Sequence, residues 1–223
     1  MAVAEIDQQI KPNGYERGKA ERRQLILRTA AEMIAEAGSD GLTIRAIAAR
    51  AGLSPVTVYN LFGSKHAVLK DLYTDDYQQL VGFFEDHASN DALIRIFDLI
   101  DLSARYYLRR LNYHLALFTE LIRHSDTDVA VGDWDTRSIN MQRLLGAAVD
   151  AGYLQKDTPV ETLARMFIRI GKSLSQEWVD GSLTADQSRL ELGVTYHLIL
   201  SKFATAKAAR PLMEMAARYG IEN

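Results

Sequence analysis

The 223-residue chain contains no cysteine, which excludes disulfides, thiol nucleophiles and thiolate metal sites. No uninterrupted apolar run approaches the roughly 20 residues of a membrane-spanning helix, and the N-terminus lacks the apolar segment of a secretory signal. A glycine-rich phosphate loop and a paired-histidine metal motif are also missing. From these absences we expect a cytoplasmic protein with no membrane association, no cofactor, no metal site and no catalytic residues.

Strand-like alternation of apolar and polar residues is absent too, so the sequence predicts an all-α fold. Apolar residues recur at helical spacing in several stretches. Two of these stretches begin with a capping-box pattern, Thr158-Pro159-Val160-Glu161 and Thr184-Ala185-Asp186-Gln187. The predicted helices cover about residues 18–37, 44–51, 55–62, 64–86, 91–110, 112–124, a segment ending near 152, 158–179 and 184–207, followed by a short helix from 211.

The stretch TIRAIAARAGLSPVTVYNLFGSK, residues 43–65, has the pattern of a helix-turn-helix. Thr43 can cap a first helix, and Gly52 follows the last apolar residue of that helix. Ser54 and Pro55 suit the cap and first position of a second helix. In this second helix, Val58 and a phenylalanine four residues later would point inward and leave a mixed polar face exposed.

This stretch resembles the DNA-binding signature of TetR-family transcriptional regulators. The resemblance rests on Thr43, Ile47-Ala48, Ala51-Gly52-Leu53-Ser54, Val58-Tyr59, Phe62 and Ser64-Lys65, which follow one another without a gap. It implies a flexible leader at 1–17, a three-helix DNA-binding domain at 18–63, a connecting helix at 64–86 and a larger helical effector-binding and dimerisation domain at 87–223. The implied function is a repressor that releases a near-palindromic DNA operator when an effector binds.

The resemblance also assigns roles on the DNA-binding domain. Thr57, Tyr59 and Asn60 are expected to contact bases or backbone, and Val56 to meet a thymine methyl group. Thr43, Ser54 and Lys65 are expected to bind phosphates. Arg45 could reach either a base or a phosphate. The full predicted DNA-binding set is Thr43, Arg45, Ser54, Pro55, Val56, Thr57, Tyr59, Asn60 and Lys65.

The distribution of charge agrees with a DNA-binding N-terminal part. The net charge of the whole chain is −3, yet residues 1–70 contain ten Lys and Arg against seven Asp and Glu. Residues 71–223 contain sixteen against twenty-two, a balance of −6. Contact with phosphates requires local positive charge, which the N-terminal part supplies. Ordinary fluctuation of charge along a chain is the alternative explanation.

A DNA reader of this kind needs two recognition helices, so we expect a homodimer. In TetR-like proteins the last two long helices pair with their twofold mates, and glycines on these helices would permit close approach. The alternative is that the same side chains form an ordinary intrachain core. The predicted interface is Phe167, Gly171, Leu174, Leu190, Gly193, Val194, His197 and Ser201.

The middle helices are rich in aromatic residues, which favours a pocket for a small hydrophobic or aromatic effector. Each of these aromatic residues could instead be part of the ordinary core. The groups that could meet an acidic group on such a ligand are His114, Arg105, Arg109, Arg110 and Arg123, and surface placement is the favoured alternative for most of these arginines. The predicted effector-binding set is Phe84, Tyr107, Tyr113, His114, Phe118, Trp134, Met141, Phe167 and Trp178.

Two other interpretations stay open from the sequence. A TetR-like regulator could be constitutive or controlled by a protein partner, and a well-formed cavity between residues 80 and 180 would argue against that version. An all-α enzyme built from residues distant in sequence is the remote alternative, but it leaves the match at residues 43–65 unexplained. The polar segment 125–133, read either as a metal loop or as a surface linker, favours the linker.

Overall fold

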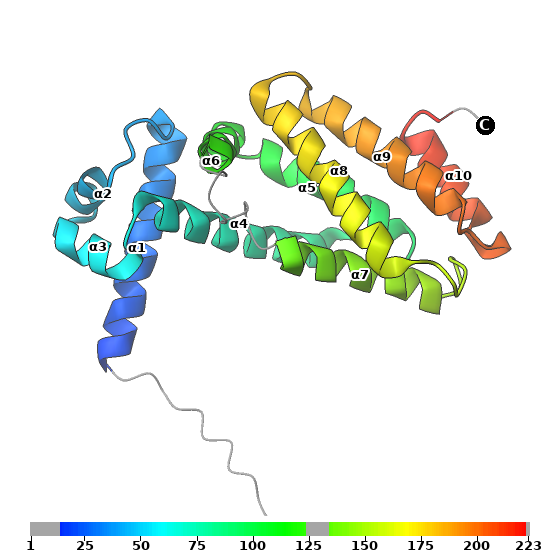
Figure 1. The fold of residues 1–223 in the computed structure, drawn as a ribbon, viewed down its shortest axis with the longest axis horizontal. Coiled ribbons are helices and arrows are strands. Elements are labelled where there is room, and N and C mark those ends of the chain that lie inside the picture. The colour runs from blue at the N-terminus through cyan, green and yellow to red at the C-terminus, as the bar shows by residue number, and fades with distance from the viewer. Residues whose placement is uncertain (1–13, 124–133, 222–223) are drawn as a thin grey trace, which may run out of the picture. The chain divides into compact units, whose positions relative to one another are not determined.

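The computed structural model describes residues 14–123 and 134–221, and all of the regular secondary structure in these ranges is helical. The first three helices are α1 (Gly14–Ala37), α2 (Ile44–Ala51) and α3 (Pro55–Phe62). They are followed by α4 (Lys65–His87), α5 (Ile94–Leu108), α6 (Leu111–Arg123), α7 (Trp134–Asp150), α8 (Val160–Asp180), α9 (Ala185–Ser201) and α10 (Ala209–Arg218), with a short 3₁₀ turn at Ala206–Ala208 (Figure 1). The predicted all-α class is confirmed.

The chain divides into two compact units, one ending at Val68 and the other beginning at Leu69. The division falls inside α4, a single helix whose first turn belongs to the first unit. The helix α1 begins at Gly14, so residues 14–17 are helical and not part of a leader. The rest of the expected leader, residues 1–13, lies outside the described residues, as does the polar segment 125–133.

The first unit is a three-helix arrangement built around a small apolar core. Fully or almost fully buried side chains come from α1, from the loop before α2, and from α2 and α3, and they include Ile26, Leu42, Ile47 and Val58. Two interactions of α1 lie outside this core. Arg50 of α2 pairs with Glu36 of α1, with one N–O distance of 2.6 Å, and Arg23 of α1 donates to the Leu61 carbonyl at 2.9 Å.

The second unit has its main core between α5, α7, α8, α9 and α10. Phe97, Met141, Leu145, Phe167 and Leu200 have no exposed surface. Phe167 of α8 stacks on Tyr196 of α9, with ring centroids 3.8 Å apart. In Figure 1, α8, α9 and α10 lie side by side, in agreement with their packing contacts. In the described part of the chain, no helix is long and apolar enough to cross a membrane.

Of the two predicted capping boxes, only the second is present. The Thr184 hydroxyl accepts a hydrogen bond from the Gln187 backbone N–H, and the Thr184 backbone N–H donates one to Gln187 Oε1. The predicted box at Thr158 is wrong: α8 begins at Val160, and the Thr158 hydroxyl donates to the Gln155 carbonyl at 2.6 Å. Thr158 therefore closes the preceding turn and does not cap the helix.

Candidate DNA-binding helices and effector cavity

The turn between α2 and α3 has the geometry of a helix-turn-helix. The Thr43 hydroxyl accepts from Ala46 N–H at 3.1 Å and caps α2. Gly52 ends α2 with φ +66° and ψ +29°, a left-handed conformation that disfavours side chains with a Cβ. Ser54 then caps α3 by accepting from Thr57 N–H at 3.1 Å, and Pro55 takes the first helical position. The local signals in the sequence therefore produce the turn that they predicted.

The exposed face of α3 carries the side chains expected to read DNA. Val56 is 67% exposed and Tyr59 is 62% exposed, while Val58 between them is fully buried. Asn60 is exposed and Thr57 is half-buried, with its hydroxyl 2.8 Å from that of Ser54. Large apolar side chains on an outer face of a folded unit often mark an interaction surface. Pro55, Ser54, Thr43 and Arg45 are also exposed.

Lys65 differs from the other predicted phosphate ligands because the chain itself uses its ammonium group. Its Nζ donates to the Ser39 carbonyl at 3.3 Å, and the residue is half-buried. The preceding Ser64 hydroxyl accepts from Ala67 N–H at 3.1 Å and caps α4. Phosphate binding by Lys65 would therefore compete with a contact inside the first unit.

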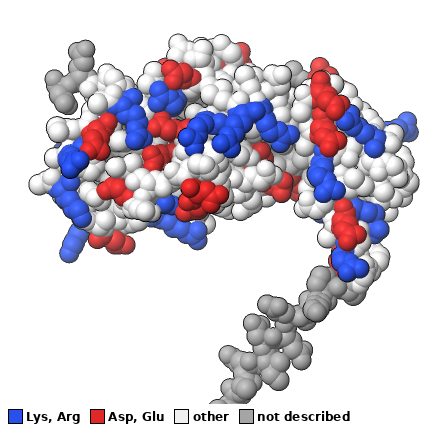
Figure 2. Space-filling model, turned by 180° about the vertical axis from the view of Figure 1, so that it is seen from behind, with Lys and Arg blue, Asp and Glu red and all other residues white. Residues whose placement is uncertain are grey.

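Basic residues of the first unit are partly neutralised by their neighbours. Arg50 forms ion pairs with Glu36 and Glu32, and its hydrogen bond with Glu36 holds the pKa of that carboxyl below its usual value. On the face of the molecule seen in Figure 2, Lys and Arg residues are intermixed with Asp and Glu residues, and neither sign covers the whole face. Contact with phosphates would therefore depend on individual side chains.

A cavity of about 510 Å³ lies in the second unit. Its volume falls in the range of roughly 300–1,000 Å³ that is usual for small-molecule sites. Five helices, α4, α5, α7, α8 and α9, contribute to its wall, which also includes Glu85, Arg95, Arg143, Lys172 and Arg189. The remaining lining residues are Tyr77, Leu80, Val81, Phe84, Leu99, Ile100, Ser103, Ala104, Tyr107, Arg137, Asn140, Leu144, Ala147, Phe167, Ile168, Gly171, Leu174, Ser175, Trp178, Ala185, Ser188, Leu192 and Tyr196.

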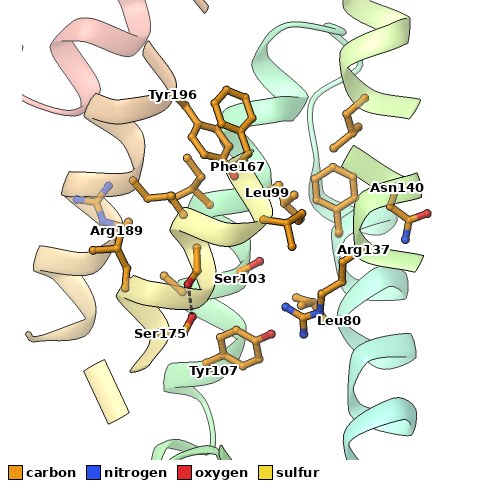
Figure 3. A pocket seen from close by; sticks show the side chains of 18 of the residues that line it. Leu80, Leu99, Ser103, Tyr107, Arg137, Asn140, Phe167, Ser175, Arg189 and Tyr196 are labelled. Atoms are coloured by element: carbon orange, nitrogen blue, oxygen red, sulfur yellow. Dashed lines mark hydrogen bonds between the residues drawn. The ribbon is translucent and has the colours of Figure 1, made fainter. Parts of the chain in front are cut away.

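The two ends of the cavity differ in chemistry. Figure 3 shows the stacked rings of Phe167 and Tyr196 at one end. Arg137 and Tyr107 lie at the other end, where the Arg137 guanidinium and the Tyr107 hydroxyl are directed toward one another. Burial raises the pKa of Tyr107, so its hydroxyl stays protonated near neutral pH. The wall is thus mostly apolar, and its polar side chains, which include Arg137, Asn140 and Arg189, are spread around it.

Four of the nine predicted effector residues line this cavity: Phe84, Tyr107, Phe167 and Trp178. Four of the other predicted residues lie elsewhere in the structure. Met141 is fully buried in the main core, and Tyr113, His114 and Phe118 pack between α6 and its neighbours without lining the cavity. The structure does not describe the side chain of Trp134.

His114 belongs to a buried polar cluster, not to the cavity wall. Its Nδ1 lies 2.8 Å from the Tyr107 carbonyl oxygen, and its Nε2 lies 3.2 Å from Asp76 Oδ1. The Tyr106 hydroxyl also donates to Asp76 Oδ1, at 3.1 Å. Both ring nitrogens of His114 thus lie within hydrogen-bond distance of an oxygen atom. This cluster joins α4, α5 and α6.

Most residues of the predicted dimer interface serve the chain's own core or cavity. Phe167 and Leu174 are buried, and both line the cavity together with Gly171. Gly193 is covered by Tyr219, whose ring carbons Cδ1 and Cε1 would lie 2.3 Å from an added Cβ. A close approach exists at Gly193, but its partner is Tyr219 of the same chain, and the assignment of Gly193 to the dimer interface stays a prediction.

The remaining interface residues are less enclosed. Leu190 and Val194 are half-buried against the main core. His197 is half-buried, with Nε2 3.2 Å from the Leu212 carbonyl oxygen, and only Ser201 is exposed. Large exposed apolar side chains on α8 and α9 are instead Met166, 40% exposed, and Leu198, 61% exposed. Sequence periodicity did not separate these outward positions from the inward ones.

Two charged residues that matter for the second unit, the half-buried Arg137 and the buried Asp76, were missed, although the sequence contains a signal for both. Arg137 lies four residues before Met141 and therefore on the inward stripe of α7, where a charged residue is unusual. Asp76 lies three residues after Tyr73 and four before Leu80, on the buried stripe of α4. In both cases a charged residue on the apolar face of a predicted helix was the signal that could have identified the residue.

The comparisons with known proteins agree with these features. The family model of "Bacterial regulatory proteins, tetR family" matches residues 26–72, which include α2, the turn and α3. Residues 26–72 therefore carry the DNA-binding sequence of the TetR family. This match and the helix-turn-helix support a DNA-binding transcriptional regulator.

Several solved TetR-family structures share the fold of the whole chain. A protein described as a TetR-family transcriptional regulator from Syntrophomonas wolfei has a TM-score of 0.63 at 21% identity, covering 84% of this chain and 98% of its own. A fatty acid degradation regulator from Bacillus halodurans has a TM-score of 0.61 at 20% identity, covering 80% and 94%. A transcriptional repressor from R. erythropolis has a TM-score of 0.58 at 20% identity, covering 82% and 95%. No curated protein matches the chain at a significant level.

Proposed function

We propose that this protein is a ligand-responsive repressor of the TetR type that binds a near-palindromic operator as a homodimer and releases it when a small hydrophobic effector enters the cavity. The observation that carries the proposal is the cavity of about 510 Å³ with a largely apolar wall. A cavity of this size argues against a regulator that is constitutive or controlled only by a protein partner.

The helix α4 offers a physical link between effector and DNA. Tyr77, Leu80, Val81 and Phe84 of α4 line the cavity, and the same helix begins at Lys65, three residues after the end of α3. An effector that contacts α4 can bias its position only if the ligand binds the DNA-free conformer more tightly than the DNA-bound one. The maximum loss of DNA affinity then equals that difference in ligand affinity.

DNA contact is assigned to the exposed face of α3 and its flanking caps. Tyr59, Asn60 and Thr57 would contact bases or backbone in the major groove, and Val56 would pack on a thymine methyl group. Thr43, Ser54, Arg45 and Lys65 would bind phosphates, in the case of Lys65 by exchanging its contact with Ser39. The exposure of Tyr59 and Val56 supports this assignment.

The test is a fluorescence-anisotropy titration of the protein against labelled DNA from the region upstream of its own gene. Wild type is compared with Tyr59→Ala and with the control Met213→Ala, which removes a side chain that is 59% exposed on α10. Salt-sensitive binding that Tyr59→Ala loses and Met213→Ala retains supports the assignment. Equal binding by all three proteins would contradict the role of α3, and DNA affinity unchanged by hydrophobic ligands would contradict the ligand response.

A further inference from the structure

The inference drawn here concerns the chemical class of the effector, and it rests on the proposed ligand response. We propose that the effector is an amphipathic anion, whose acidic group is held by Arg137 and whose apolar body extends toward Phe167 and Tyr196. Arg137 contacts the cavity from α7, and the two aromatic rings close its opposite end (Figure 3).

The charge of the cavity wall favours an anion over a neutral or cationic ligand. Among the described residues that line the cavity, five are Arg or Lys and one, Glu85, is acidic. Two of the cations are engaged in ion pairs: Arg95 lies 2.7 Å from Glu85, and Arg189 lies 3.1 Å from Asp101. Cationic side chains thus outnumber acidic ones among the described lining residues, and low-dielectric walls strengthen the effect of charge on a ligand in this space.

Arg137 is the cation best placed to select the ligand because its neighbours orient it. Its guanidinium carbon lies 4.6 Å from the ring centroid of Tyr77 and 5.1 Å from that of Tyr73, and its guanidinium faces the Tyr107 hydroxyl (Figure 3). Arginine commonly stacks on aromatic faces and binds oxygens in the plane of its guanidinium. Carboxylate and phosphate groups both match this planar fork.

Two hydroxyl groups add to the polar groups of the cavity wall. Tyr107 presents its hydroxyl beside Arg137, and the Ser103 hydroxyl lies on the same wall (Figure 3). The Ser175 hydroxyl on the wall is already used within α8, since it donates to the Gly171 carbonyl at 2.7 Å. The opposite end offers aromatic and aliphatic surface, as a hydrocarbon or ring system requires. One end thus recognises an acidic group and the other excludes water.

The experiment compares matched ligands that differ only in the head group: decanoate, decyl phosphate and decan-1-ol. The chain has two tryptophans, and one of them, Trp178, lines the cavity. A Trp134→Phe background makes Trp178 the sole tryptophan, so its fluorescence reports occupancy of the cavity. In that background, wild-type Arg137 is compared with Arg137→Gln, Arg137→Lys and the control Arg165→Gln, an exposed arginine outside the cavity.

We expect decanoate or decyl phosphate to bind the parent more tightly than decan-1-ol. Arg137→Gln should weaken binding of the preferred anion by roughly tenfold or more, with a smaller loss in Arg137→Lys and none in Arg165→Gln. Binding of decan-1-ol should change by less than about twofold. The relative affinities of decanoate and decyl phosphate identify the acidic group, and circular dichroism of each variant checks that the fold is retained.

The outcomes separate the inference from the function on which it rests. One outcome is that decan-1-ol binds as tightly as the anions and releases DNA equally well from the parent and from Arg137→Gln. In that case the effector is not an anion, but the protein still responds to a ligand. If Arg137→Gln and Arg165→Gln weaken the anions equally, recognition by Arg137 is wrong. If no amphiphile changes Trp178 fluorescence or DNA affinity, both the inference and the proposed ligand response fail.

Discussion

Replacement of Gly193 by alanine tests the packing of the second unit most directly. In an ordinary helix interior, glycine to alanine stabilises a protein by about 1 kcal/mol. At Gly193 the added Cβ would lie 2.3 Å from Tyr219 Cδ1 and 2.5 Å from its Cγ. Normal carbon–carbon contacts are about 3.5–4.0 Å, so the Tyr219 ring must move by more than about 1 Å.

The ring of Tyr219 is not free to move by that amount. It is 4% exposed, and its hydroxyl donates to Asp101 Oδ1 at 3.1 Å and to the Phe97 carbonyl at 3.4 Å. Crowding of this kind costs about 1–3 kcal/mol. The unfolding temperature of a protein of this size shifts by about 2–4 °C for each kcal/mol, so Gly193→Ala should lower it by about 2–12 °C.

Differential scanning calorimetry measures this shift, with Gly146→Ala as the matched control. Gly146 also lies inside a helix of the second unit, and nothing approaches within 4 Å of the position of an added Cβ. Gly146→Ala should therefore raise the unfolding temperature slightly. In a Tyr219→Ala background, Gly193→Ala should change sign and become neutral or stabilising, because the obstructing ring is gone.

An equal, stabilising effect at both glycines would refute the reasoning and show that Tyr219 does not cover Gly193. A loss of dimer at unchanged subunit stability, measured by analytical ultracentrifugation, would instead support the interface role that the sequence suggested for Gly193. The two results differ, because a clash inside the subunit destabilises the protein at every protein concentration, whereas a weakened interface acts only near the dimer dissociation constant.

Three further predictions concern the DNA-binding face, the buried polar cluster and a helix start. Tyr59→Phe, which keeps the ring, should weaken DNA binding by less than Tyr59→Ala, for which we expect a loss of roughly tenfold or more in anisotropy titrations. Asp76→Ala removes the acceptor of two hydrogen bonds and leaves His114 without its carboxylate, so urea unfolding should show a loss of about 3 kcal/mol. Thr184→Ala removes the cap from Gln187 N–H and should cost about 1 kcal/mol in the same assay.

Each of these predictions has an outcome that would contradict it. Equal DNA affinity of Tyr59→Ala and wild type would remove Tyr59 from the contact surface. A stability of Asp76→Ala within about 0.5 kcal/mol of wild type would show that the cluster contributes little. For Thr184, the control is Thr158→Ala, which removes a turn hydrogen bond and no helix cap. A larger loss of helical circular dichroism in Thr158→Ala would contradict the observed start of α8.

Much of the first unit could be predicted because short-range signals determine it. Thr43, Gly52, Ser54 and Pro55 act on the backbone within three or four residues of themselves, through caps, a left-handed glycine and a fixed proline φ. Such signals depend little on the remainder of the fold. The alternation of buried Val58 with exposed Val56 and Tyr59 follows in the same way from helical periodicity.

The cavity and the polar cluster depended on tertiary structure. Which aromatic residue lines the cavity is decided by how α4, α5, α7, α8 and α9 cross, and helical spacing cannot distinguish the cavity-lining Trp178 from the core residue Met141. Likewise, Gly193 indicates close approach but not its partner, because Tyr219 comes from a helix end 26 residues later.

The amino-acid sequence by itself determined the all-α class and the helix-turn-helix, because caps, glycines and apolar periodicity act locally along the chain. Only the tertiary structure decided that Arg137 lines the cavity, that His114 pairs with Asp76, and that Gly193 is covered by Tyr219. The last two contacts join residues that are 38 and 26 positions apart, and the cavity wall comes from five helices. The energies of such contacts depend on distances that the order of residues does not specify.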